Sequence, residues 1–147
     1  MYKHLLIPTD GSELSSRAVV SGVELARTLG AAVTFLYVQP EFPLPIAGEG
    51  AMLAPESREE FSQGTREQAN RILDEALAIA KQAEVQANAL TEASDIPYQV
   101  IINAALGQNC DLVFMASHGR KGLAGLLVGS ETHKVLTHSK VPVLVYR

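Results

Sequence analysis

The sequence has no tryptophan, only one cysteine, Cys110, and no apolar run long enough to cross a membrane. A lone cysteine cannot form a disulfide within the chain, so the small disulfide-stapled scaffolds are excluded. We expect the Cys110 thiol to be buried rather than reactive, because apolar Leu112 and Val113 follow it closely. The apolar run near the N-terminus is short and is followed closely by Asp10, which does not fit a signal peptide. These features predict a cytoplasmic protein with no membrane partner.

An excess of positive charge is missing as well. The chain has 12 Lys and Arg against 16 Asp and Glu, a formal net charge of -4. Phosphate backbones and anionic lipids attract a basic face, so we expect no nucleic-acid partner. With 147 residues, of which 47% are hydrophobic and 19% charged, the composition predicts one compact domain over residues 1–147.

Apolar segments alternate with amphipathic ones along most of the chain. Runs of apolar and β-branched residues predict strands at 5–7, 31–38, 85–91, 112–116 and 141–146. Apolar residues three or four apart predict helices at 13–29, 57–83, 96–108 and 130–139. As helix N-caps we expect Asp10 or Ser12 at the first helix and Asp95 at the third. This order predicts the α/β class, with an open, mostly parallel five-stranded sheet and helices on both faces.

Residues 39–55 interrupt this pattern with four prolines and two glycines. We expect no regular structure there, because a loop of this length in a compact domain is usually a lid, a binding loop or disordered. In open parallel sheets, ligands bind outside the carboxyl ends of the strands. The loops after the first, second and fourth strands are therefore where we expect a site.

The loop after the fourth predicted strand has four glycines between Ser117 and Ser130. Glycines let backbone N–H groups approach an anion, and the N–H groups that begin the next helix attract phosphate. The stretch has neither the G-x-x-x-x-G-K-[ST] nor the G-x-G-x-x-G arrangement, which argues against a P-loop and a dinucleotide site. Simple turn formation is the alternative explanation of these glycines. Asp10, after the first strand, can contact a ribose or a metal, or cap the first helix.

Three segments carry a resemblance to a known family. Residues 3–12 end in an Asp-Gly-Ser turn, and residues 116–130 follow the pattern G-x2-G-x9-G-[ST] with Ala116 in place of its first glycine. Residues 141–146 include Pro-Val-Leu-Val. Over essentially its whole length the sequence resembles the universal stress protein family in its single-domain form. The resemblance implies a Rossmann-like fold of the adenine nucleotide alpha-hydrolase type.

The resemblance also implies a ligand and the residues that bind it. In family members that bind ATP, the motif glycines and hydroxyl surround the phosphates, the aspartate after the first strand holds the ribose or adenine side, and the backbone ending the second strand meets adenine. The implied positions are Pro8, Asp10, Val38, Ala116, Gly119, Gly129, Ser130 and Glu131. The methyl of Ala116 either crowds a phosphate or is harmless, and a Cβ at Gly129 is expected to occupy the place of the anion. ATP, with or without Mg²⁺, is the implied cofactor.

Patterns for metal binding and catalysis are weak. His133 and His138 are five positions apart and fall on different faces of a helix, so they do not form a metal pair. We interpret His118, Arg120 and Lys121 as solvated residues of the loop rather than catalytic ones. The sequence pairs no nucleophile with a base, and we expect ATP hydrolysis to be slow if it occurs at all.

The resemblance implies a stress-response regulatory module that binds adenine nucleotide and acts as a dimer. Pro142 and the apolar residues after it are typical of an edge strand, which a second copy can cover. The resemblance points to the same homodimer, formed through the C-terminal strand. The alternatives are a nucleotide-free dimeric adaptor that works through protein contacts, and a slow ATPase.

Overall fold

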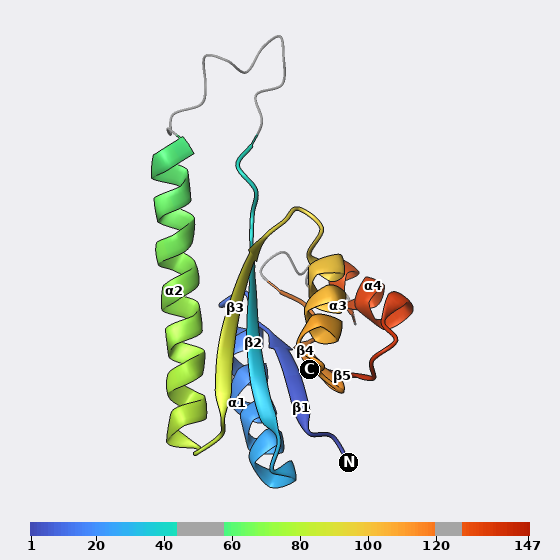
Figure 1. Ribbon diagram of the computed structural model, residues 1–147. Helices are drawn as coiled ribbons and strands as arrows, with labels where there is room; N and C mark the ends of the chain where they lie inside the picture. The colour runs from blue at the N-terminus through green and yellow to red at the C-terminus, as the bar shows by residue number, and fades with distance from the viewer. Residues whose placement is uncertain (44–57, 120–127) are drawn as a thin grey trace.

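A computed structural model describes residues 1–43, 58–119 and 128–147. Within them, parallel strands form one five-stranded sheet in the order β3-β2-β1-β4-β5, flanked by helices (Figure 1), which confirms the predicted class. The strands are β1 (His4–Pro8), β2 (Ala32–Gln39), β3 (Ala87–Ala93), β4 (Leu112–Ala116) and β5 (Val143–Tyr146). The helices are α1 (Glu13–Leu29), α2 (Arg58–Gln82), α3 (Pro97–Gly107) and α4 (Ser130–His138).

The helices cover the sheet from both sides. α1 and α2 lie on one face and α3 and α4 on the other (Figure 1), each pair over its own apolar core. Along β1, Leu5 and Ile7 face the first core and Leu6 faces the second. The inner strands are apolar on both faces because both faces are covered. Among the described residues, no helix is both long and apolar enough to cross a bilayer.

The strand order reverses between β1 and β4. β2 and β3 follow one another on one side of β1, and β4 and β5 follow one another on the other side. The loop after β1 therefore leads to α1 on one face of the sheet, and the loop after β4 leads to α4 on the other face. The two loops separate at the carboxyl ends of these strands. A crevice is expected at this point of such a sheet.

One of the expected helix caps is wrong. Ser12 is the N-cap of α1, and its side chain accepts a hydrogen bond from the Ser15 N–H (3.3 Å). At α3, however, the N-cap is Ile96, which makes no side-chain cap bond. The carboxylate of Asp95 instead accepts a bond from the Glu41 N–H (3.3 Å), in the chain that follows β2. Asp95 fails as a cap because the helix begins one residue too late for it.

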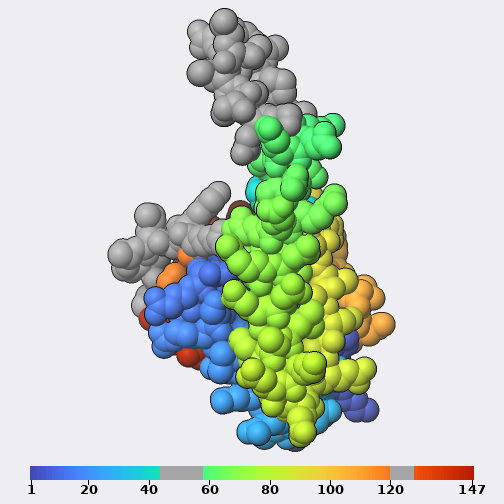
Figure 2. All heavy atoms as spheres, turned by 90° about the vertical axis from the view of Figure 1, so that its left-hand side faces the viewer, coloured from blue at the N-terminus to red at the C-terminus, as the bar shows by residue number. Residues whose placement is uncertain are grey.

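The segment between β2 and α2 is described only at its ends. β2 extends one residue further than predicted, to Gln39, and α2 begins at Arg58. The rings of Phe42 and Phe61 meet edge to face at 5.3 Å, and the Arg58 guanidinium lies 5.5 Å from the centre of the Phe42 ring. The first turns of α2 project beyond the rest of the described chain (Figure 2). Residues 44–57, which make up most of the expected lid or binding loop, lie outside the described residues.

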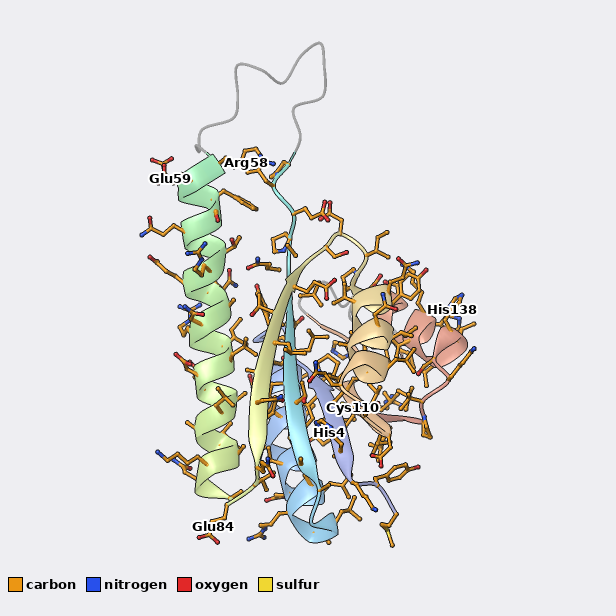
Figure 3. All side chains as sticks on the ribbon, in the orientation of Figure 1. His4, Arg58, Glu59, Glu84, Cys110 and His138 are labelled. Atoms are coloured by element: carbon orange, nitrogen blue, oxygen red, sulfur yellow. The ribbon has the colours of Figure 1, made fainter. Side chains whose placement is uncertain are left out.

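Cys110 lies at the amino end of the sheet, close to His4 on β1 (Figure 3). Its side chain is buried, which confirms that expectation. Burial raises the pKa of the thiol to about 11, and this effect outweighs a hydrogen bond from Thr34 that lowers it. The hydroxyl of Thr34 is itself bonded to the Nε2 of His4 (2.8 Å).

We predict that Cys110 does not react with a thiol reagent such as DTNB in the native protein, because the thiolate is scarce at neutral pH and the sulfur is covered. It should react fully after unfolding in guanidinium. The unfolded thiol ionises near 9.0 and the native one near 11, so the free energy of unfolding should fall as pH rises through this range. Urea unfolding midpoints on either side of it measure this. Fast labelling of the native protein contradicts the buried placement.

β5 is an outer strand of the sheet, as predicted, although it begins at Val143 rather than at residue 141. The carbonyls of Pro142 and Tyr146 accept hydrogen bonds from β4 and the residue after it (2.9 and 2.7 Å). The backbone N–H and C=O groups of successive residues alternate between the two sides of a strand. The N–H and C=O groups of Val143 and Val145 therefore point to the outer edge of the sheet. The Leu144 side chain is 39% exposed.

Candidate functional site

A cavity of about 600 Å³ opens at the carboxyl ends of the strands, where the strand order reverses. Its walls come from the ends of β1, β2 and β4, the segment between β3 and α3, and the first turn of α4. A volume of this size is typical of small-molecule sites. All the positions that the sequence predicted line this cavity: Pro8, Asp10, Val38, Ala116, Gly119, Gly129, Ser130 and Glu131.

Asp10 meets the loop that follows β4. Its Oδ1 accepts a hydrogen bond from the Ser12 N–H (3.0 Å), which fixes the turn after β1. The other carboxylate oxygen lies so close to Gly119 that a Cβ built there would overlap it. The lack of a side chain at Gly119 therefore lets the two loops of the crevice approach each other. Beneath them the buried hydroxyls of Thr9 and Ser15 bond to each other at 3.1 Å.

The backbone of Val38 faces the cavity. The Leu36 carbonyl accepts a bond from the Thr9 N–H (2.9 Å) on the β1 side, and the Gln39 carbonyl accepts one from Ser94 (3.0 Å) on the β3 side. Because the two sides alternate along a strand, the N–H and C=O of Val38 point to the β1 side. β1 has ended there, at Pro8. Val38 thus presents one donor and one acceptor at the edge of the cavity.

Gly129 packs against the residues that follow β4. Its N–H donates to the Ser117 carbonyl (2.6 Å), and an added Cβ would lie 3.1 Å from the Cβ of His118 and 3.2 Å from that same carbonyl oxygen. Such a Cβ would press on Ser117 and His118, the residues that follow β4. The glycine therefore permits close packing of two backbone segments, and the expected effect of a Cβ on a bound anion stays a prediction.

The first turn of α4 presents backbone donors. The first hydrogen bond of the helix runs from the His133 N–H to the Gly129 carbonyl (2.9 Å). The N–H groups of Ser130, Glu131 and Thr132 precede it and have no partner within the helix. These three residues line the cavity. Their donors, together with the positive end of the helix dipole, are suited to an anionic group.

Ala116, in the place of the first motif glycine, packs into the core. Its side chain belongs to the cluster beneath α1 and α2. Its carbonyl accepts a hydrogen bond from the Oγ1 of Thr132 (3.0 Å), whose side chain is buried. This bond fixes the start of α4 to the end of β4, so the methyl group at Ala116 is used in packing while the backbone positions the helix.

The carboxylate of Glu131 joins the starts of two helices. Its Oε2 accepts a hydrogen bond from the Tyr98 N–H in the first turn of α3 (2.9 Å), and its Oε1 accepts one from Lys134 Nζ (2.8 Å). The bond to Glu131 raises the pKa of the Lys134 ammonium. Glu131 on α4 therefore satisfies an N–H group of α3 that Asp95 was expected to satisfy.

Sequence reasoning missed part of the cavity wall. It overlooked the connection after β3, although every loop at the carboxyl edge of a parallel sheet can reach such a site. It also overlooked buried hydroxyls and treated a histidine as solvated. The missed lining residues include Thr9, Ser15, Ser94, Asp95, Pro97, His118 and Thr132. Arg120 and Lys121 lie outside the described residues.

The described lining of the cavity is acidic. It includes the carboxylates of Asp10, Asp95 and Glu131, one imidazole from His118, and no lysine or arginine. Within residues 1–43, 58–119 and 128–147, no group of three or more His, Cys, Asp or Glu side chains is arranged to hold a metal ion. The N–H groups of α4 are therefore the main positive feature of this part of the cavity.

A doubly wound parallel sheet with a cavity at its switch point, lined by Gly119, Gly129 and an open helix N-terminus, is the architecture typical of α/β proteins with a ligand site at this place. Within this class the chain belongs to the universal stress protein family, whose model matches residues 1–147. It is 30% identical, over 149 aligned residues, to Universal stress protein YxiE of Bacillus subtilis, and the alignment covers 100% of both chains.

Solved structures of similar proteins share the fold. That of MJ0577, a universal stress protein of Methanocaldococcus jannaschii, has a TM-score of 0.82 at 26% identity and covers 99% of this chain and 96% of its own. A universal stress protein in complex with cAMP has a TM-score of 0.72 at 24% identity, covering 99% and 97%. An Arabidopsis thaliana family protein with AMP bound has a TM-score of 0.69 at 16% identity, covering 98% and 90%.

Proposed function

We propose that this protein binds adenine nucleotide in the cavity at the carboxyl edge of its sheet and acts as a stress-response regulatory module. The observation that carries the proposal is the convergence on one cavity of positions from the ends of β1, β2 and β4 and the start of α4. The relatives solved with cAMP and with AMP support the adenine class of ligand.

Val38 is the proposed contact for the adenine base. Adenine has an amino group that donates and a ring nitrogen that accepts on its Watson–Crick edge, which matches the C=O and N–H of one extended residue. The apolar side chains of Ile101 and Met115 also line the cavity and can pack on the faces of the base. Guanine presents a carbonyl oxygen and an N–H on the same edge, so its polarity is reversed and it should bind more weakly.

Asp10 and the start of α4 are the proposed contacts for the ribose and phosphates. The carboxylate of Asp10 lines the cavity and can accept hydrogen bonds from ribose hydroxyls, while the absence of a Cβ at Gly119 lets it lie against the loop after β4. The hydroxyl of Ser130 and the N–H groups that follow it can bind phosphate oxygens. Pro8, Ala116 and Gly129 serve this proposal as walls and as packing residues rather than as donors.

ATP is the nucleotide we propose, alone or with Mg²⁺. Magnesium in nucleotide sites is usually held by one or two carboxylates together with the phosphates, and it keeps several waters. The lining carboxylate of Asp10, beside the glycine loop, fits this requirement. When bound, the ion would neutralise phosphate charge near the acidic lining of the cavity.

The proposal includes a homodimer formed through the edge strand β5. The outward backbone groups of Val143 and Val145 are suited to pairing with the same strand of a second copy. We place the protein in the cytoplasm, where a lone buried thiol such as Cys110 stays reduced.

Backbone NMR tests the location of the site. During titration with ATP, the amide resonances of Val38, Gly119 and Ser130 should shift along one saturation curve. The amides of Gly30 and Glu84, at the opposite end of the sheet, serve as the internal control and should not move. Saturable shifts that leave Val38 and Ser130 unmoved would contradict the proposed site.

A further inference from the structure

Glu131 occupies an unusual place for an acidic residue in an anion site. It is the second residue of α4, it lines the cavity, and its side chain is 37% exposed. Its carboxylate accepts the Tyr98 N–H of α3 at 2.9 Å, so it lies at the N-terminal ends of both α3 and α4. Lys134 completes this cluster: its Nζ is 2.8 Å from the other carboxylate oxygen of Glu131 and 5.4 Å from the centre of the Tyr98 ring. We call Glu131, Tyr98 and Lys134 the α3–α4 clasp.

The charge of Glu131 is about equal and opposite to that of the two helix ends beside it. A helix N-terminus carries the equivalent of about half a positive charge, so the two helix ends together contribute about one. The carboxylate of Glu131 contributes one negative charge in the first turn of α4. Lys134 adds a positive charge, but its side chain is 46% exposed and water screens it more effectively. Asp10 and Asp95 add further negative charge to the lining.

We infer that Glu131 is a specificity-determining residue, which lowers the gain in affinity that each added phosphate group brings and so directs recognition toward the nucleoside part of the ligand. This inference rests on the proposed adenine site. It predicts that adenosine, AMP and ATP bind with similar affinities in the absence of Mg²⁺. The reason is that the negative charge of Glu131 offsets the attraction between the α4 N–H groups and a ligand phosphate.

The substitution E131Q separates charge from structure. Glutamine keeps an oxygen that can accept the Tyr98 N–H, so the contact between α3 and α4 is retained while the charge is lost. At low ionic strength without Mg²⁺, calorimetry should find adenosine affinity unchanged within about twofold. AMP should bind about two- to fivefold more tightly than to the wild type, and ATP should gain more than AMP.

Two control variants define the result. K134A removes the cation of the α3–α4 clasp and should weaken the binding of AMP and ATP. The change in affinity should be smaller than for E131Q, because Lys134 is exposed. E131A removes the acceptor for Tyr98 as well and reports the structural role, with melting temperatures checking the fold of all three variants.

The outcomes separate the two proposals. If E131Q leaves the order and spacing of the three affinities unchanged, or changes all of them by one common factor, Glu131 has only a structural role and the inference is wrong. If the wild type binds none of the three ligands, the proposed function itself fails. A selective gain for the phosphorylated ligands supports both.

Discussion

Replacing Gly119 with valine should abolish most nucleotide binding while leaving the protein folded. A Cβ at this position would overlap the carboxylate of Asp10, and the branched side chain adds bulk to the same overlap. Either Asp10 or the loop after β4 must move, and each movement removes a proposed contact to the ribose or phosphates. The loss of one hydrogen bond to a charged group, about 1.5–3 kcal/mol, lowers affinity by roughly 10- to 150-fold.

Gly107 offers a matched control for this variant. It lies at the end of α3, a Cβ there would meet no atom within 4 Å, and its backbone does not require glycine. G107A should bind nucleotide as the wild type does. Calorimetric titration of G119V, G107A and the wild type, with circular dichroism to check folding, measures the effect. Wild-type affinity in folded G119V would remove the contact between Asp10 and Gly119 from the account of the site.

Replacing Val145 with proline should convert the proposed homodimer to monomers. The N–H of Val145 points to the outer edge of β5, so proline removes a donor that a second copy needs without removing a bond to β4. The ring also blocks close approach of another strand. V145A keeps the N–H and should remain dimeric, which controls for the lost side-chain volume.

Sedimentation velocity at tens of micromolar separates the two states. We expect dimers for the wild type and V145A and monomers for V145P, and all three should unfold cooperatively. A wild type that is monomeric at this concentration contradicts pairing through β5. A V145P variant that remains dimeric would place the interface elsewhere.

The architecture was predictable because each element has a strong local pattern. β2 and β4 are short, continuous apolar runs, and α1 has an apolar stripe that ends at a glycine; α1 and β4 have their predicted bounds, and β2 differs by one residue at each end. The edge position of β5 followed from Pro142 and is confirmed. These features depend on neighbours in the sequence, so periodicity alone reveals them.

The contacts that shape the site depend on the tertiary fold and were missed for that reason. Asp95 has the right residue type for a cap, but Glu131, 33 positions from Tyr98 in the sequence, meets the start of α3 instead. The glycine at position 119 could be recognised from its motif, but its close approach to Asp10 could not. The order of the elements indicates which loops lie at this end of the sheet, but it gives no contact between residues of different loops.

The central claim is that the cavity binds adenine nucleotide, and calorimetry with three ligands tests it most directly. ATP with Mg²⁺ and AMP should each bind one site per chain with micromolar affinity. GTP should bind at least tenfold more weakly, about 1.4 kcal/mol, because its base reverses the donor and acceptor that Val38 matches. No detectable binding of either adenine nucleotide, or equal affinity for GTP, would contradict the claim.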